Sequence, residues 1–180
     1  MKTAGKLFMF IYRVLAWVLI AAAAVLTVLF IIGIRPYAVK TGSMEPAIHE
    51  GSLCFINHNT PYEELHEGQV IAFKTGEMLV THRIVRVDPD GIVTKGDANN
   101  TTDAAKVNKE NYIGKNEAVL PFLGRLPLFA QSGSGKYIMI FGFVAFLLVG
   151  LLYDKIAAWI TKKEENDAAQ SGDNDKDKEG

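Results

Sequence analysis

Charged residues are missing from two long stretches, which dominate the hydrophobic pattern of the chain. Residues 14–34 read VLAWVLIAAAAVLTVLFIIGI, and residues 137–153 read YIMIFGFVAFLLVGLLY. As a helix the first stretch would be about 31 Å long, enough to cross a hydrocarbon core of about 30 Å. The second is short, but it extends through residues 156–160 if Asp154 and Lys155 snorkel to the interface. We therefore predict transmembrane helices over 14–34 and 137–160.

A cleaved signal peptide is the alternative interpretation of the first stretch. The apolar part of a signal peptide spans about 7–15 residues and ends at small residues. Here the small residues Ala21–Ala24 lie in the middle of the stretch, and apolar residues continue to Ile34. A retained membrane anchor fits this pattern better.

Basic residues flank the two predicted helices on the sides away from the central segment. They are Lys2, Lys6, Arg13, Lys155, Lys162 and Lys163. Because positively charged flanks stay in the cytoplasm, we expect residues 1–13 and 161–180 to be cytoplasmic and residues 35–136 to lie outside. This predicts a cell-membrane protein with two spans. Its outer segment of about 100 residues has the size of one small domain.

The outer segment is predicted to be mainly β. Residues 53–57, 70–74, 78–87 and 91–95 are rich in Val, Ile, Phe and Thr. Turn sequences separate them, and the PDG at 89–91 is a strong hairpin signal. Residues 61–68 have helical or turn character. The two prolines of 121–129 favour an extended connector, and QSGSG at 131–135 favours a flexible link to the second span.

The composition changes after Lys163. The tail contains seven acidic residues and no aromatic residue, so we predict that residues 161–180 are disordered. The whole chain has a net charge of −1, which argues against a nucleic-acid partner. Cys54 is the one cysteine, so no disulfide can form within the chain, and its apolar neighbours predict a buried side chain.

Three polar motifs of the outer segment could carry chemistry. Ser43 lies in TGSMEP, His82 in VTHRIV, and Asp97 and Asp103 in KGDANNTTD. A serine nucleophile needs an adjacent base, and a histidine base needs a carboxylate that fixes its tautomer. The bland alternative is that each residue is structural, because serine and aspartate are common in turns.

In the order GSMEP, HRIV and KGD, these motifs resemble those of the type I signal peptidases over roughly residues 14–125. The likeness is to the endoplasmic-reticulum-type branch, which also occurs in archaea and some Gram-positive bacteria. A histidine at position 82 marks this branch, because the other bacterial branch has a lysine base there. The resemblance implies a small β-rich catalytic domain between two membrane helices.

By this resemblance, Ser43 matches the nucleophile, His82 the general base and Asp103 the acid of a Ser-His-Asp triad. Asp97 matches the aspartate of the Gly-Asp motif, in a supporting role or as the alternative acid. The chain departs from the family at Gln69, where Gly-Asp is common, and at GDANN, where GDNN is common. The implied activity is removal of signal peptides from secretory preproteins with small residues at −1 and −3. Neither a cofactor nor a metal is implied, and an accessory subunit stays open.

Ser43 lies nine residues after Ile34, so it is within about 30 Å of the end of the first predicted span. We expect Met44 and Ile48 to be exposed and to dip into the lipid bilayer. Met44 and Pro46 are candidates for substrate binding. The catalytic loop would then meet substrates where they leave the membrane.

Two competing hypotheses remain. One is a related protease with a Ser–Lys pair that uses Lys74 or Lys95, although Lys74 looks exposed. The other is a membrane-tethered β-domain that binds a secreted partner without catalysis. The remaining histidines, His49, His58 and His66, lie in polar sequence and are predicted to be solvated, and no spacing among them indicates a metal site.

Overall fold

The computed structural model describes residues 2–176 and divides the chain into two compact units. One unit combines Met1–Val18 with Lys136–Gly180, and the other is Leu19–Gly135. The first unit contains the start of helix α1 (Lys2–Ile31) and most of helix α3 (Gly133–Lys176). These helices contact each other through aromatic rings, including Tyr12 stacked on Phe146 with the ring centroids 4.6 Å apart.

Two helical stretches are long and apolar enough to cross a membrane. They are Leu7–Ile31, with 25 residues, and Gly133–Tyr153, with 21 residues. Both overlap the predicted spans, but each begins earlier than the charge-free stretch that predicted it. Length and composition support membrane association, whereas the orientation of the spans stays a prediction.

The first span ends sooner than the sequence pattern predicts. α1 stops at Ile31, and Ile34 already belongs to strand β1 (Ile34–Ala38). Gly33 makes the turn between them with a φ of +81°, a conformation that glycine adopts at no steric cost. The side chain of Asn59 donates a hydrogen bond to the carbonyl of Ile32 at 2.9 Å, which ties the helix end to the β-domain. The charge-free stretch runs past the helix because it includes the turn at Ile32 and Gly33 and the first residue of β1, Ile34.

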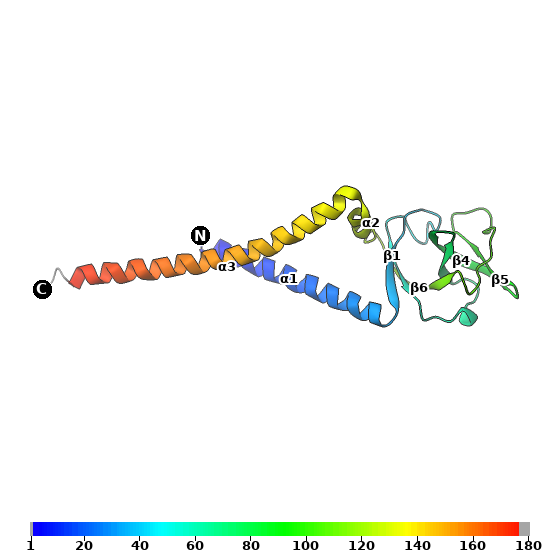
Figure 1. The fold of residues 1–180 in the computed structure, drawn as a ribbon, viewed down its shortest axis with the longest axis horizontal. Coiled ribbons are helices and arrows are strands. Elements are labelled where there is room, and N and C mark those ends of the chain that lie inside the picture. The colour runs from blue at the N-terminus through cyan, green and yellow to red at the C-terminus, as the bar shows by residue number, and fades with distance from the viewer. Residues whose placement is uncertain (1, 177–180) are drawn as a thin grey trace. The chain divides into compact units, whose positions relative to one another are not determined.

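The second unit, which contains the strands labelled in Figure 1, is built on one antiparallel sheet. Its strands follow the order β1-β2-β6-β3-β4-β5. The further strands are β2 (Leu53–Asn57), β3 (Val70–Thr75), β4 (Met78–Asp88), β5 (Gly91–Lys95) and β6 (Tyr112–Leu120). Four of these confirm the predicted strands, and the pairing of Asp88 with Gly91 confirms the hairpin. The helical character of residues 61–68 becomes the short 3-10 helix η1 (Tyr62–Glu64).

The strands β1 and β6 were not predicted from the sequence. β6 reads YIGKNEAVL, and its polar centre hides the β pattern. β1 directly follows an apolar helix and contains Pro36, a residue that strands tolerate at a sheet edge.

The predicted extended connector over residues 121–129 is wrong. Its second half is helix α2 (Arg125–Gln131), which is followed after Ser132 by α3. Pro127 is the third residue of α2, where a backbone N–H has no partner within the helix, so the proline does not break it. QSGSG is accordingly the junction of two helices rather than a flexible link.

Two clusters of buried side chains form the core of the β-domain. One contains Leu65, Ile71, Phe73, Ile84, Ile92 and Val107, and the other contains Met44, Ile48, Cys54, Ile56 and Ala72. Met44 is only 2% exposed and Ile48 only 3%. The expectation that these two residues dip into the bilayer is therefore wrong, because both anchor the loop of Ser43 to the core.

The acidic tail is the last part of helix α3, which ends at Lys176. Residues 177–180 lie outside the described residues. The composition instead predicts disorder over 161–180, since this segment has no apolar face to pack. Glu, Lys and Ala are good helix formers, which is compatible with a helical backbone there. The disorder of the tail stays a prediction.

Candidate functional site

Ser43 lies in a loop whose two ends are pinned together. The N–H of Val39 donates to the carbonyl of Ser52, and the N–H of Gly51 donates to the carbonyl of Val39, both at 2.9 Å. Within the loop the N–H of Ile48 donates to the carbonyl of Met44 at 2.8 Å. Because the Met44 and Ile48 side chains are buried, the half-buried Ser43 is held at a fixed position beside the core.

His82 lies in β4 with its side chain turned into the domain, and the residue is only 7% exposed. Its partner in β3 is Ile71. The ring of Phe73 meets the imidazole edge-on, with centroids 6.1 Å apart. Packing in the middle of the sheet therefore restricts the orientation of the imidazole.

The two ring nitrogens of His82 contact the two other members of the predicted triad. Nε2 lies 3.2 Å from the Ser43 Oγ, and Nδ1 lies 2.7 Å from Oδ2 of Asp103. The residues are 39 and 21 positions apart along the chain. The structure thus brings Ser43, His82 and Asp103 into one hydrogen-bonded chain.

Asp103 follows β5 and is held twice by one residue of that strand, Thr94. The Asp103 N–H donates to the Thr94 carbonyl at 2.8 Å, and the Thr94 hydroxyl donates to Oδ2 of Asp103 at 2.6 Å. The sequence analysis missed Thr94. The available signal was a threonine inside an apolar strand, two residues before the Gly-Asp motif.

Asp97 does not contact His82 in the structure but pairs with the neighbouring Arg83. The Arg83 Nε and one terminal nitrogen donate to the two carboxylate oxygens of Asp97 at 2.9 and 2.7 Å. The other terminal nitrogen donates to the Gly68 carbonyl at 2.8 Å. The bidentate pair raises the pKa of Arg83. Asp97 therefore has the geometry of a structural residue, and Asp103 that of the triad acid.

Gly96 lies against both the Ser43 loop and the imidazole of His82. A Cβ added there would lie 2.5 Å from the Ser43 carbonyl oxygen and 3.0 Å from Nε2 of His82. The same Ser43 carbonyl accepts the N–H of Ala98 at 3.0 Å. The glycine of the Gly-Asp motif is thus needed for close packing of the serine loop.

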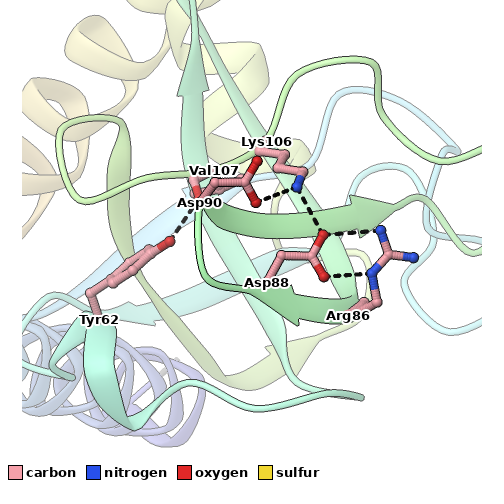
Figure 2. A network of polar contacts seen from close by, with 6 residues as sticks. All are labelled: Tyr62, Arg86, Asp88, Asp90, Lys106 and Val107. Carbon is pink, nitrogen blue, oxygen red and sulfur yellow. Dashed lines mark hydrogen bonds and ion pairs between the residues drawn. The ribbon is translucent and has the colours of Figure 1, made fainter.

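A network of charges outside the site holds the segment that follows Asp103. Lys106 donates to Asp88 at 2.8 Å and to Asp90 at 2.5 Å, and both carboxylates belong to the β4–β5 hairpin region (Figure 2). Arg86 forms a bidentate pair with Asp88 at 2.6 and 3.0 Å. The hydrogen bonds from Arg86 and Lys106 hold the pKa of Asp88 well below its usual range.

The backbone beside Lys106 is fixed as well. Val107 and Ile92 exchange two backbone hydrogen bonds of 2.8 Å, and the Tyr62 hydroxyl donates to the Val107 carbonyl at 2.8 Å (Figure 2). The segment that carries Asp103 is therefore held at two points. Thr94 holds Asp103 itself, and Ile92 and Tyr62 hold Val107.

The other predicted residues lie in different surroundings. Pro46 is exposed, whereas Met44 is buried and lines no open surface. Lys74 is exposed, as predicted, and Lys95 is half-buried in register with Arg83. Among the described residues, no group of three or more His, Cys, Asp or Glu residues could hold a metal ion.

His58 departs from its prediction. It is half-buried, and its ring lies 3.2 Å from the hydroxyl of Tyr37. Burial and the charge of Arg35 lower the pKa of His58. His49 and His66 are exposed, as predicted for solvated residues.

A hydroxyl, an imidazole and a carboxylate in this order can perform nucleophilic acyl chemistry. The imidazole can accept the hydroxyl proton at Nε2 while the carboxylate holds the proton on Nδ1. The Thr41 hydroxyl lies 3.5 Å from the Ser43 Oγ on an exposed part of the loop.

Comparison with known proteins identifies one family. The model of "Signal peptidase, peptidase S26" matches residues 11–128. Signal peptidase I W of Bacillus subtilis is 42% identical over 79 residues, which are 41% of this chain and 42% of that protein. Signal peptidase complex catalytic subunit SEC11 of Fusarium vanettenii is 29% identical over 124 residues, 62% of this chain and 72% of that protein. The human subunit SEC11C is 29% identical over 104 residues, half of this chain and 54% of that protein.

Proposed function

The chain belongs to the signal peptidase family S26, and from this premise we propose that it is a membrane-bound serine endopeptidase that removes signal peptides from secretory preproteins. The observation that carries the proposal is the hydrogen-bonded chain from Ser43 through His82 to Asp103. A binding module has no physical need for these three groups in this order.

In the proposed reaction, the Ser43 Oγ attacks the carbonyl carbon of the scissile peptide bond while Nε2 of His82 accepts its proton. His82 then gives this proton to the leaving amine, and an acyl-enzyme remains on Ser43. Water, deprotonated by His82, releases the acid product. Asp103 keeps Nδ1 protonated and stabilises the imidazolium.

The negative oxygen of the tetrahedral intermediate needs hydrogen-bond donors. The backbone N–H of Ser43 is one candidate. The Thr41 hydroxyl is the second candidate, because it lies 3.5 Å from the Ser43 Oγ. Replacing Thr41 by valine should lower kcat by about 100–1000-fold and leave KM nearly unchanged, since the donor acts on the transition state.

The substrate is proposed to extend along β4 next to His82. Ile84 exchanges backbone hydrogen bonds with Gly68 and Gln69 on the β3 side. By the alternation of antiparallel strands, Leu79 and Thr81 direct their N–H and C=O groups to the opposite side. Within the described residues, β5 pairs with β4 only from Arg83 onward, so this edge can accept an extended peptide.

An extended peptide on this edge would account for small residues at −1 and −3. Side chains two residues apart point to the same side of a strand, so both would face one wall of the site. Pro46 is exposed on the Ser43 loop and remains a candidate for that wall. Met44 would act indirectly, by holding the loop.

The membrane arrangement is also part of the proposal. We place both termini in the cytoplasm and the β-domain outside, as the basic flanks predict. α2 fits a location at the lipid surface, because Leu126 and Phe129 within it and Phe122 just before it are exposed, and α2 ends two residues before α3 begins. A cysteine at the exposed Glu77 should react with a membrane-impermeant thiol reagent on intact cells. Reaction only after permeabilisation would reverse the orientation.

The test is to incubate the detergent-solubilised protein with a preprotein and to sequence the N-terminus of the product. Wild type and the control Ser134→Ala, which changes an exposed serine outside the site, should cleave after a small residue. Ser43→Ala and His82→Ala should not. A Ser–Lys enzyme would survive His82→Ala and fail on loss of Lys74 or Lys95.

A non-catalytic binding domain would leave the preprotein intact in every variant. The fungal and human relatives are named as catalytic subunits of a complex. To test whether this chain also needs a partner, we add a membrane extract from the source cells. The extract is first treated so that it no longer cleaves the preprotein by itself. Cleavage that requires both the extract and Ser43 would show such a need.

A further inference from the structure

Thr94 makes a double contact with Asp103 that the triad does not itself require. Its carbonyl accepts the Asp103 N–H at 2.8 Å, and its hydroxyl donates to Oδ2 at 2.6 Å. One residue thus fixes both the backbone and the carboxylate of Asp103. The second contact ends on the same oxygen that lies 2.7 Å from Nδ1 of His82.

The surroundings of Thr94 make this contact rigid. The residue is completely buried in β5, and its partner in β4 is Ile84, two residues after His82. A β-branched side chain has restricted χ1 freedom, which favours a single direction for the hydroxyl. The Asp103 side chain, in contrast, is 21% exposed and lies on a segment outside the strands.

We propose that Thr94 is a positioning residue of the peptidase, which holds Oδ2 of Asp103 at the His82 ring. The inference rests on the proposed function, because it assigns a role within the same site. The Thr94 hydroxyl acts through the carboxylate and does not touch substrate or the reacting atoms.

Two consequences distinguish this role from ordinary packing. If Thr94 acts through Asp103, its hydroxyl matters only while the carboxylate is present. Serine keeps the hydroxyl and loses a methyl group, whereas valine keeps the shape and loses the hydroxyl. A packing role would instead make Thr94→Ser the more defective variant, and it would do so in both backgrounds.

The experiment measures kcat and KM for Thr94→Val and Thr94→Ser in wild type and in Asp103→Asn, with melting temperatures for each protein. Thr94→Val should lower kcat by about 10–100-fold at nearly unchanged KM, and Thr94→Ser should keep most of the activity. In Asp103→Asn, Thr94→Val should add less than about a threefold loss, because residues that act as a unit are not additive. Equal losses from Thr94→Val in both backgrounds, or a defect in Thr94→Ser as large as or larger than that in Thr94→Val, would overturn the proposal.

A second readout needs no substrate and separates failure of this inference from failure of the proposed function. The readout is an NMR spectrum of protein labelled with ¹⁵N at its four histidines. The signal of the proton on Nδ1 of His82 is identified because it is missing in His82→Gln. We expect its signal to shift or broaden in Thr94→Val and to be kept in Thr94→Ser. A signal that is the same in Thr94→Val and wild type would refute the positioning role, even in a protein that cleaves nothing.

Discussion

Replacing Gly96 by alanine tests how closely the Ser43 loop must approach His82. The added Cβ would lie 2.5 Å from the carbonyl oxygen of Ser43, 2.8 Å from the side-chain nitrogen of Asn99 and 3.0 Å from Nε2 of His82. Asn99 can turn away, since it is a side chain. The Ser43 carbonyl cannot, because it belongs to the backbone of the loop and accepts the N–H of Ala98.

The size of the displacement follows from the contact distance. Non-bonded heavy atoms settle about 3.5 Å apart, so the Ser43 backbone has to move by roughly 1 Å. The buried Met44 side chain resists this movement, which makes the substitution an overpacking change that costs about 1–3 kcal/mol. The Ser43 Oγ is 3.2 Å from His82 at present, and a shift of this size moves it out of hydrogen-bond range. A misplacement of about 1 Å can lower a rate by about 100-fold.

The assay combines preprotein cleavage with thermal unfolding. We expect Gly96→Ala to lower kcat by about 100-fold or more and the melting temperature by roughly 2–12 °C. Gly133→Ala is the matched control, because a Cβ at Gly133 meets nothing within 4 Å. Full activity and unchanged melting in Gly96→Ala would show that the serine loop adjusts freely, and the argument from close packing would fail.

Three further predictions concern the groups around the site. Burial raises the pKa of the Cys54 thiol to about 11. At pH 8 its alkylation should therefore be roughly 100-fold slower in the folded protein than after unfolding in urea, and similar rates in both states would show that Cys54 is accessible in the folded protein. Asp97→Asn should lower the free energy of unfolding by only about 1 kcal/mol, because the ion pair that it breaks with Arg83 is partly exposed. It should change kcat less than tenfold. A loss of kcat as large as that of Asp103→Asn would identify Asp97 as the triad acid. Burial and the charge of Arg35 lower the pKa of His58, so the unfolded chain binds the proton more tightly than the folded one. The free energy of unfolding in urea should therefore fall as the pH drops below about 6.5. His58→Gln should make this fall smaller, and an equally steep fall in the variant would contradict the prediction.

The β-strands that the sequence predicts are those rich in Val, Ile, Phe and Thr. β3 and β5 are largely buried, so their composition alone identifies them. β6 is recognised only through its partners, because it lies between β2 and β3 and its pairing compensates for polar residues such as Lys115 and Asn116. Pairing over long sequence distances leaves no local pattern, which is why the position of β6 could not be predicted.

Exposure is the property that local sequence predicts least well in this chain. Met44 follows the proposed nucleophile in a turn-rich loop, and its apolar side chain there suggested a contact with lipid. The structure instead buries it against Cys54 and Ile56. Exposed apolar residues lie instead in and just before α2, for example Leu126 and Phe122, where the sequence had suggested only a connector. Whether an apolar side chain of a loop is exposed depends on how the loop packs against the sheet, which the local sequence does not show.

The choice between two aspartates shows where sequence reasoning about the site ends and geometry begins. Asp97 follows β5 directly and lies nearer to Thr94 along the chain, but its position next to Gly96 directs it to Arg83. Asp103 comes six residues later, after the segment has turned back far enough for its N–H to reach the Thr94 carbonyl. An aspartate can orient His82 only from the side of Nδ1, opposite the Ser43 contact at Nε2. The chain meets this requirement by returning to the buried strand that pairs with β4, so the acid is selected by the path of the loop rather than by the motif in which it lies.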